Sequence, residues 1–243
     1  EVLLVPPASL TDAMARVTPG EGRWRKELGA YSASELATKG AGTGRMECAI
    51  PGLSAARAVA ILSAYVAGSW AYRGTATAQA HAAAPAYIAA WVPMTPAGET
   101  MAQREASVEA LTAFAASHPS YARDMIGRDP GLMPLATPAL GLSQGEAIEG
   151  VALCLIEGAN GLTLSADRAL IDEATLDLFA ARLTHLAAAN AQAPISDLPL
   201  IGAPEEKVLS RLNATARDFD NQTISRLFEA QVARTPGATA SVF

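Results

Sequence analysis

Apolar residues recur every three or four positions along several stretches of this chain, which is the spacing of a helix that buries one face. Capping residues mark where three of these stretches begin: Ser54, Asp172, and Thr100 paired with Gln103 as a capping box. We therefore predict helices over residues 23–36, 54–72, 100–115 and 172–190.

Short apolar runs between these helices predict strands, at residues 46–50, 79–84, 87–94, 151–156 and 161–165. The last two runs are joined by Glu157-Gly-Ala-Asn160, which suits a hairpin turn. The apolar run 132–142 contains Pro134 and Pro138, so we expect it at a sheet edge or partly irregular. Strands that alternate with helices and include hairpins predict an α+β sandwich rather than a fully parallel sheet.

The two ends of the chain have a different pattern. Residues 1–22 contain prolines and glycines without clear periodicity, and we expect an irregular segment there. After residue 191, three prolines precede two short amphipathic stretches, 205–212 and 225–233. Helices this short are marginal by themselves, so they must lie on a neighbouring surface, and we interpret the region as a linker.

Composition then narrows the class of protein. The chain has 243 residues, 24 acidic and 18 basic side chains, a net charge of −6 and no clustered Lys/Arg surface, which excludes nucleic acid as a partner. The longest uncharged apolar stretch, 58–72, is too short to span a membrane. Two distant cysteines and three scattered histidines predict reduced thiols and no metal site in a cytoplasmic protein. Because the sequence lacks an initiator Met, we expect a segment of a longer chain.

Two short motifs suggest chemistry that their context disfavours. Residues 141–145 match a nucleophile elbow, and Ser143, Asp172 and His185 follow the chain order of an α/β-hydrolase triad. A strand follows this motif instead of the required helix, so a Ser143 hydrolase remains a remote alternative. The glycine run 40–44 is also followed by a strand, which disfavours a phosphate-binding loop.

The C-terminal third carries the most specific pattern. Its segments are Ile195-Ser-Asp-Leu-Pro-Leu-Ile-Gly-Ala-Pro-Glu205, Val208-Leu-Ser-Arg-Leu-Asn-Ala-Thr215, Leu227-Phe-Glu-Ala-Gln231, Ala233-Arg-Thr-Pro236 and Ala240-Ser-Val-Phe243. Together they resemble the junction between a condensation domain and an adenylation domain in nonribosomal peptide synthetases. Two departures are Leu212, where that family commonly has Trp, and Ile201, where it has Leu.

The preceding residues resemble the C-terminal lobe of a condensation domain, which implies a chloramphenicol-acetyltransferase-like two-layer α+β sandwich followed by a helical linker. Arg128-Asp129 with Met133-Pro-Leu135 resembles one element of that lobe. In residues 87–94, which match a strand of the tunnel, the family's Asn, Thr and basic residue are missing. The resemblance divides the chain into an N-terminal segment (1–22), the lobe (23–192), the linker (193–224) and the start of an adenylation domain (225–243).

Two further departures bear on activity. The family's reaction uses two adjacent histidines followed by three residues and Asp-Gly, and this sequence has no such motif. Active members also insert a long excursion toward the N-terminal lobe, where this chain has only residues 143–150. We therefore expect a naturally truncated, non-catalytic partial domain with no catalytic residue, which is a structural platform for the adenylation domain.

The resemblance also implies interface residues and partners. The linker and adenylation interface is expected at Leu209, Leu212, Asn213, Thr215, Leu227, Phe228, Arg234 and Pro236. The partners would be the adjacent adenylation domain and a peptidyl carrier domain, which holds the phosphopantetheine, so this chain itself would bind no cofactor. In the alternative interpretation, a separate N-terminal lobe completes a working acyl-transfer site, and Tyr87 and Trp91 line its tunnel. Both interpretations place the protein in secondary metabolite biosynthesis.

Overall fold

The computed structural model describes residues 8–34, 36, 40–132, 136–217 and 222–239. The chain forms two units, Glu1–Gly202 and Ala203–Phe243. The first unit holds the sheet and its packed helices and is called the lobe below. The second unit contains α8 (Ala203–Asn213) and α9 (Ile224–Arg234). None of the helices in the described ranges is long and apolar enough to cross a membrane.

The lobe is built on a six-stranded mixed sheet with the order β1-β6-β5-β4-β2-β3. Its strands are β1 (Arg45–Ile50), β2 (Trp70–Arg73), β3 (Val92–Met94), β4 (Leu140–Gln144), β5 (Leu153–Gly158) and β6 (Gly161–Asp167). Strand β4 pairs in parallel with both β2 and β5, and the other pairs are antiparallel. The predicted hairpin over 157–160 is confirmed, because β5 and β6 pair as far as Gly158 opposite Gly161.

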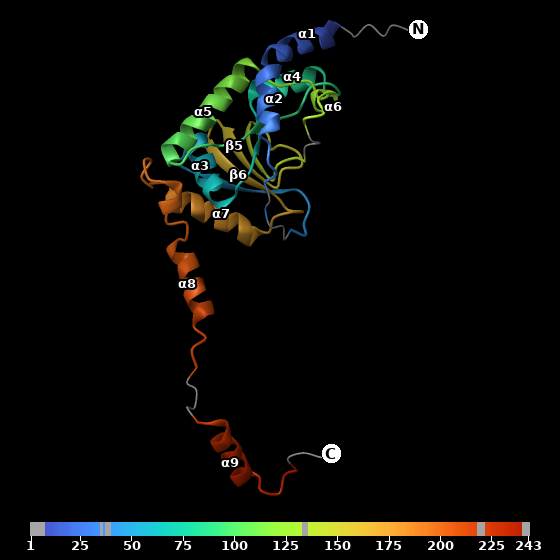
Figure 1. Ribbon diagram of the computed structural model, residues 1–243. Coiled ribbons are helices and arrows are strands. Elements are labelled where there is room, and N and C mark those ends of the chain that lie inside the picture. The colour runs from blue at the N-terminus through green and yellow to red at the C-terminus, as the bar shows by residue number, and fades with distance from the viewer. Residues whose placement is uncertain (1–7, 35, 37–39, 133–135, 218–221, 240–243) are drawn as a thin grey trace. The chain divides into compact units, whose positions relative to one another are not determined.

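Three helices cover one face of this sheet: α3 (Ala55–Tyr65), α5 (Met101–Ser117) and α7 (Glu173–Leu186) (Figure 1). Side chains alternate along each strand, so that Leu153 and Leu155 of β5 join the helix-side core together with Ile61 of α3. Leu155 and Ile61 are at most 1% exposed, which is the burial expected for a packed interior. This two-layer arrangement confirms the predicted α+β sandwich.

The opposite face of the sheet is covered in part by the segment that joins β4 to β5. Residues 145–152 return along the sheet so that the two strands run parallel, although such crossovers usually need a dozen or more residues. Ile148 and Val151 of this segment pack on Ala71 and Cys154 in a second, smaller cluster. The central strands are therefore buried on both faces.

The predicted helix starts after Ser54, Thr100 and Asp172 are confirmed. The Ser54 and Asp172 side chains accept hydrogen bonds from the backbone amides of Arg57 and Thr175, at 3.1 and 2.8 Å. Thr100 and Gln103 form the complete capping box at the start of α5. These bonds satisfy backbone amides that have no partner within the helix itself.

Several other boundaries and elements were wrong in the N-terminal half. The segment predicted as irregular contains α1 (Ala8–Val17) and a short 3-10 turn (Thr18–Gly20), and α2 covers Glu21–Gly29 rather than 23–36. The helix after Ser54 ends at Tyr65, and Trp70 begins strand β2. Gly68 separates them with φ of 115°, and a Cβ there would lie 2.7 Å from the Ser34 Cα. Trp70 continues the apolar spacing of the preceding helix, but it would be apolar in a buried strand as well, so its full burial does not distinguish the two elements.

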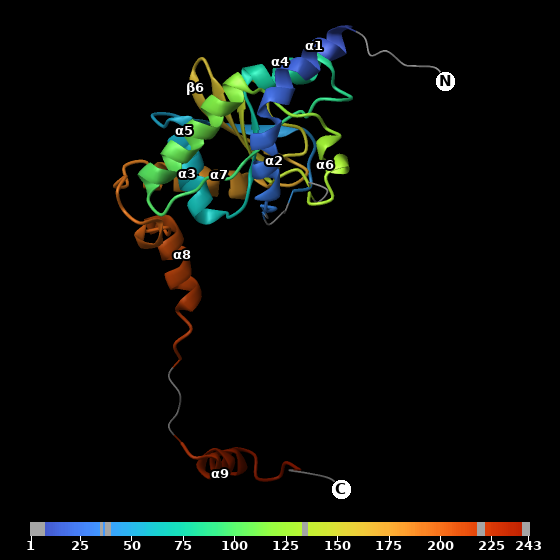
Figure 2. The same ribbon diagram turned by 45° about the horizontal axis from the view of Figure 1, so that its top comes forward.

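The strand predicted over 79–84 is wrong, because these residues lie in or directly after helix α4 (Thr75–Ala83), where a run of alanines favours the helix. Helix α4 packs beside α1 and α5 (Figure 2). Only Val92–Met94 of the run 87–94 is a strand, and Ile88 forms an isolated bridge with Ala122.

Of the two alternatives for the run 132–142, the partly irregular one is confirmed at residues 136–139, and the sheet-edge one is wrong. Its strand, β4, begins at Leu140, after both prolines, and lies inside the sheet. The predicted element at Met133–Leu135 lies outside the described residues. Arg128, by contrast, ends the short helix α6 (Met125–Arg128) and forms ion pairs with Asp124 at 3.0 Å and Glu21 at 3.7 Å.

Residues 193–202, the first part of the predicted linker, belong to the lobe and pack on its other elements. The backbone amide of Ile195 donates to the Glu99 carbonyl at 2.8 Å, and Leu198, just after the 3-10 turn Ile195–Asp197, is buried. The Tyr65 hydroxyl donates to the Leu200 carbonyl at 2.8 Å. These contacts anchor the chain directly before α8.

Burial of the sheet predicts which leucines stabilise the lobe. Leu164→Ala removes a fully buried side chain of β6 and should lower the free energy of unfolding by about 2–5 kcal/mol. The matched Leu209→Ala change, at a 44% exposed position of α8, should stay within about 0.5 kcal/mol. Chemical denaturation measures both, and equal losses would contradict the described core.

The two free cysteines should differ in reactivity. Burial raises the pKa of the Cys154 thiol, which lies 3.6 Å from the Ser143 hydroxyl, so its reactive thiolate is scarce near neutral pH. Cys48 is only partly buried. An alkylating reagent at pH 7 should therefore label Cys48 in the folded protein and Cys154 only after denaturant is added. Equal labelling of both thiols in the native protein would contradict this packing.

Candidate functional site

The carboxyl ends of β2, β4 and β5 lie at one edge of the sheet, because these three strands run parallel. Gly74, Gln144 and Glu157 lie at or directly after these ends, and helix α4 begins at Thr75. Open sheets with parallel strands commonly bind ligands in the crevice beyond their carboxyl ends. The topology therefore favours a binding site at this edge.

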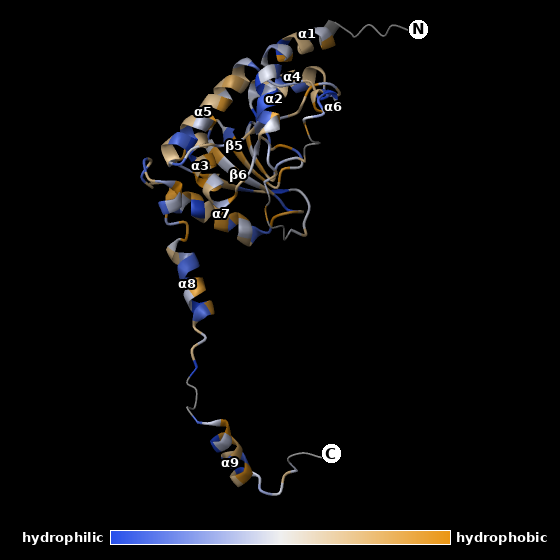
Figure 3. Cartoon of the chain, viewed as in Figure 1, coloured by the Kyte–Doolittle hydropathy of each residue, from blue (hydrophilic) through white to orange (hydrophobic). Residues whose placement is uncertain are grey.

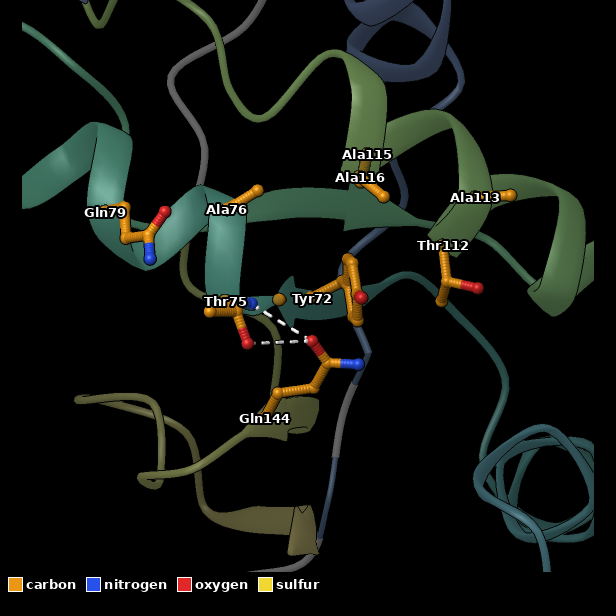
Figure 4. A pocket seen from close by; sticks show the side chains of 10 residues that line it. Tyr72, Thr75, Ala76, Gln79, Thr112, Ala113, Ala115, Ala116 and Gln144 are labelled. Carbon is orange, nitrogen blue, oxygen red and sulfur yellow. Dashed lines mark hydrogen bonds between the residues drawn. The ribbon is translucent and has the colours of Figure 1, made fainter.

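Three cavities of about 470, 200 and 650 Å³ lie here and share Gln144, and together we call them the sheet-end cleft. Tyr72 and Thr112 line the first two cavities. Figure 4 shows the cavity of about 470 Å³, which lies between the start of α4 and the side of α5. Its lining residues are Tyr72, Gly74, Thr75, Ala76, Gln79, Thr112, Ala113, Ala115, Ala116 and Gln144.

Gln144 organises the polar groups of the cleft. Its Oε1 accepts from the Thr75 backbone amide at 3.0 Å and from the Thr75 hydroxyl at 3.2 Å, as Figure 4 shows. Its Nε2 donates to Glu157 Oε2 at 3.1 Å. The N-cap residue Gly74 has no side chain to offer, so Gln144 caps α4 from the neighbouring strand. A Cβ on Gly74 would lie 2.6 Å from the Tyr72 hydroxyl oxygen, which explains the glycine.

Tyr72 forms the buried wall of the cleft and is 5% exposed. Burial, reinforced by the Glu157 carboxylate, raises the pKa of its hydroxyl, which therefore stays protonated at neutral pH. The described residues around the three cavities include Glu109 and Glu157, and none of them is Lys, Arg, His or Cys. This lining suits binding through hydroxyl, amide and carboxylate groups, and it offers no activated nucleophile.

The Ser143 hydrolase alternative is wrong. Ser143 is fully buried within strand β4, so it does not project from an exposed turn. His185 lies on α7 and its Nε2 is 2.7 Å from the Pro199 carbonyl oxygen, while Asp172 caps the same helix. The three residues thus have separate structural roles and form no catalytic triad.

The remaining candidate groups are also engaged in structure. The His81 Nδ1 lies 2.9 Å from the Ile88 carbonyl oxygen, and His118 stacks on Phe114 with ring centroids 4.4 Å apart. Within the described ranges, His, Cys, Asp and Glu side chains form no group of three that could hold a metal ion. The backbone amides of Gly40 and Gly42 donate to the carbonyls of Leu170 and Arg168, so the glycine run prolongs the strand pairing at its start.

Tyr87 and Trp91, the predicted tunnel residues, line different cavities. Trp91 lines a cavity of about 580 Å³ together with His81, Tyr121, Arg123 and Glu149. Tyr87 is 57% exposed and borders a cavity of about 310 Å³ next to α1. Their role in a substrate tunnel remains a prediction.

The predicted interface residues lie in the second unit, whose helices carry both polar and apolar side chains (Figure 3). Leu212 and Phe228 are 63% and 60% exposed, and Leu209 and Leu227 are also exposed. The Thr215 amide donates to the Asn213 carbonyl at 2.7 Å where α8 ends. Arg234 hydrogen-bonds Gln231 in the last turn of α9, and Pro236 is exposed.

The sheet-end cleft was missed by sequence reasoning. The sequence predicts a helix over 54–72 and a strand over 79–84, which leaves Thr75 in no element and gives no strand-to-helix turn between Tyr72 and Thr75. The signal that could have found the cleft is Gly74-Thr75 directly after a buried aromatic run, which is typical of a strand-to-helix turn.

Comparison with known proteins finds likeness in structure and none in sequence. The sequence matches no family model and no curated protein. The structure resembles the starter condensation domain of the rhizomide synthetase RzmA in two mutant forms, with TM-scores of 0.51 and 0.50 and identities of 13% and 14%. Each match covers 80% of this chain and 57% of that chain.

A nonribosomal peptide synthetase, FmoA3, in its AMPPNP-bound form, matches 92% of this chain and 31% of its own, at a TM-score of 0.47 and 14% identity. This chain therefore spans less than two thirds of the solved chains it resembles. At such low identity the likeness to RzmA concerns the fold. The mixed sheet and its helix layer thus have the fold of a nonribosomal peptide synthetase condensation domain, as the sequence resemblance implies.

Proposed function

We propose that this chain is a non-catalytic partial condensation domain of a nonribosomal peptide synthetase, and that it is a structural platform for a following adenylation domain. Two observations from different sources support the family assignment in this proposal. The lobe has the condensation-domain fold, and the segments from Ile195 onward resemble the junction between condensation and adenylation domains. The two resemblances involve different parts of the chain.

The apolar stripes of α8 and α9 carry the platform proposal. Val208, Leu209 and Leu212 recur at helical spacing in α8 and are 47%, 44% and 63% exposed. In α9 the corresponding positions are Ile224, Leu227, Phe228 and Val232, which are also exposed. Isolated helices of 11 residues are marginal in water, and contiguous exposed apolar side chains mark interaction sites. An adenylation domain would supply the surface that these stripes need.

The chemistry of the lobe supports the non-catalytic part of the proposal. His81, His118 and His185 each bind a backbone carbonyl or stack on a neighbouring ring. The lining of the sheet-end cleft offers amide, hydroxyl and carboxylate groups without an imidazole. The group that most often assists such an attack as a general base is an imidazole, and none lines the described part of this cleft. The free thiols Cys48 and Cys154 are consistent with a cytoplasmic location.

A substitution in the apolar stripe tests the platform. In the longer polypeptide that carries the adenylation domain, Leu212→Glu should lower the melting temperature of that domain, because it places a charge in the proposed apolar contact. Ser210→Glu on the same helix is the matched control and should have little effect, since Ser210 lies outside the stripe. Differential scanning calorimetry measures both variants, with amino-acid-dependent pyrophosphate exchange as a readout of adenylation.

The proposal fails if Leu212→Glu and Ser210→Glu leave the adenylation domain equally stable and equally active. It also fails if the gene continues after this chain without an adenylation core. In this chain alone, neither variant should change the stability of the lobe, because both positions belong to the second unit.

A second function is favoured by the cavity at Trp91. Trp91, Tyr121 and Ile126 give this cavity an apolar wall, and His81 and Glu149 lie at its border. Under this alternative, a separate N-terminal lobe completes an acyl-transfer site, and the cavity contacts a substrate carried on the phosphopantetheine of a carrier domain. A condensation assay with carrier-bound donor and acceptor and the complete synthetase distinguishes the two functions. If the Trp91→Ala variant forms at least tenfold less condensation product than the unchanged protein, the acyl-transfer function is favoured over the platform function.

A further inference from the structure

Two carboxylates face the sheet-end cleft without a cation to balance them. Glu109 of α5 and Glu157 of β5 both line its cavity of about 200 Å³. Glu157 Oε2 accepts a hydrogen bond from the neutral side-chain amide of Gln144. Neither Glu157 nor Glu109 forms an ion pair in the part of the chain that the structure describes. By comparison, Glu105 on the same helix as Glu109 pairs with Arg57 at 2.5 Å. The cleft therefore has a local negative potential.

The hydroxyl of Tyr72 gives this cleft a second polar feature. Tyr72 lines the cavities of about 470 and 200 Å³ and is 5% exposed, and its hydroxyl has no hydrogen-bond partner among the described residues. Burial fixes the position of the ring, and the hydroxyl borders both cavities. The hydroxyl oxygen is available to accept a hydrogen bond from a ligand donor.

Four alanines form the apolar part of the adjoining cavity of about 470 Å³, whose other lining residues include Gln79 and Thr112. Ala76 of α4 and Ala113, Ala115 and Ala116 of α5 surround the cavity in Figure 4. Although α4 begins here, the Thr75 amide is already used by Gln144, and the two carboxylates repel anions. The lining thus favours a cation with a short alkyl chain over a phosphate or a carboxylate.

We propose that the sheet-end cleft binds a primary alkylammonium ligand, with the ammonium group held by Glu109, Glu157 and the Tyr72 hydroxyl and the alkyl chain along the alanines. This site is independent of the platform function and remains if that function is disproved. An ammonium group has three donors and no acceptor, which matches two carboxylates and one hydroxyl oxygen. The binding is non-covalent.

Titration of the full 243-residue chain with three matched probes tests the site. Butylammonium, 1-butanol and butyrate are added separately to ¹⁵N-labelled protein at pH 7 and low salt. The Thr75 backbone amide and the Gln144 side-chain amide report on the cleft, because they are hydrogen-bonded to each other there. Butylammonium should give saturable shifts at both amides, and these should weaken as salt is added. Butanol should bind more weakly, and butyrate should not bind.

Variants then assign the contacts. Glu109→Gln combined with Glu157→Gln should weaken butylammonium binding about three- to tenfold, since each ion pair is partly solvated. Tyr72→Phe should weaken it about twofold or more because it removes the acceptor oxygen. The control Glu47→Gln removes an exposed carboxylate on β1 that lies outside the cleft, and it should leave the affinity unchanged.

Three results would overturn the proposal. The first is the absence of saturable shifts at Thr75 and Gln144. The second is equal binding of butyrate or butanol. The third is an unchanged affinity in the double glutamine variant, whose two substituted positions are exposed and should not disturb folding.

Discussion

Burial of strands β4 and β5 on both faces is the constraint on which the rest of the lobe depends. On one face, Leu153 and Leu155 pack under α3, α5 and α7, and on the other, Cys154 lies under Ile148 and Val151. The second contact requires the chain to return over the sheet between β4 and β5, which makes these strands parallel. Parallel strands in turn bring their carboxyl ends together at one edge. The sheet-end cleft is therefore a consequence of how the central strands are covered.

The sequence predicts well those elements whose signals are local. Thr100, Gln103, Ser54 and Asp172 are helix caps in the structure because their side chains satisfy amides within the same first turn. Periodicity fails where a residue is buried for a tertiary reason. Trp70 follows the spacing of the preceding helix, yet it is fully buried in a strand, since its burial depends on the sheet rather than on the helix.

The site was less predictable than the fold because its residues are assembled by topology. Tyr72, Gln144 and Glu157 are far apart in sequence, and only the order of strands β2, β4 and β5 places them together. The Gly141–Gly145 motif shows the converse case. Its residues match the Gly-x-Ser-x-Gly pattern of a nucleophile elbow at every position. Ser143, however, lies inside a strand that is buried on both faces, and its hydroxyl contacts the Cys154 thiol.

The proposed platform function depends on the two helices that follow the lobe. Their stripes, which include Leu212 and Phe228, are exposed, and short helices of this kind are stable when an apolar surface covers them. Hydrogen–deuterium exchange of the α8 and α9 amides tests this most directly, in this chain alone and in the longer polypeptide with its adenylation domain. The account predicts fast exchange in this chain and strong protection in the longer polypeptide. Equally fast exchange in both would contradict it.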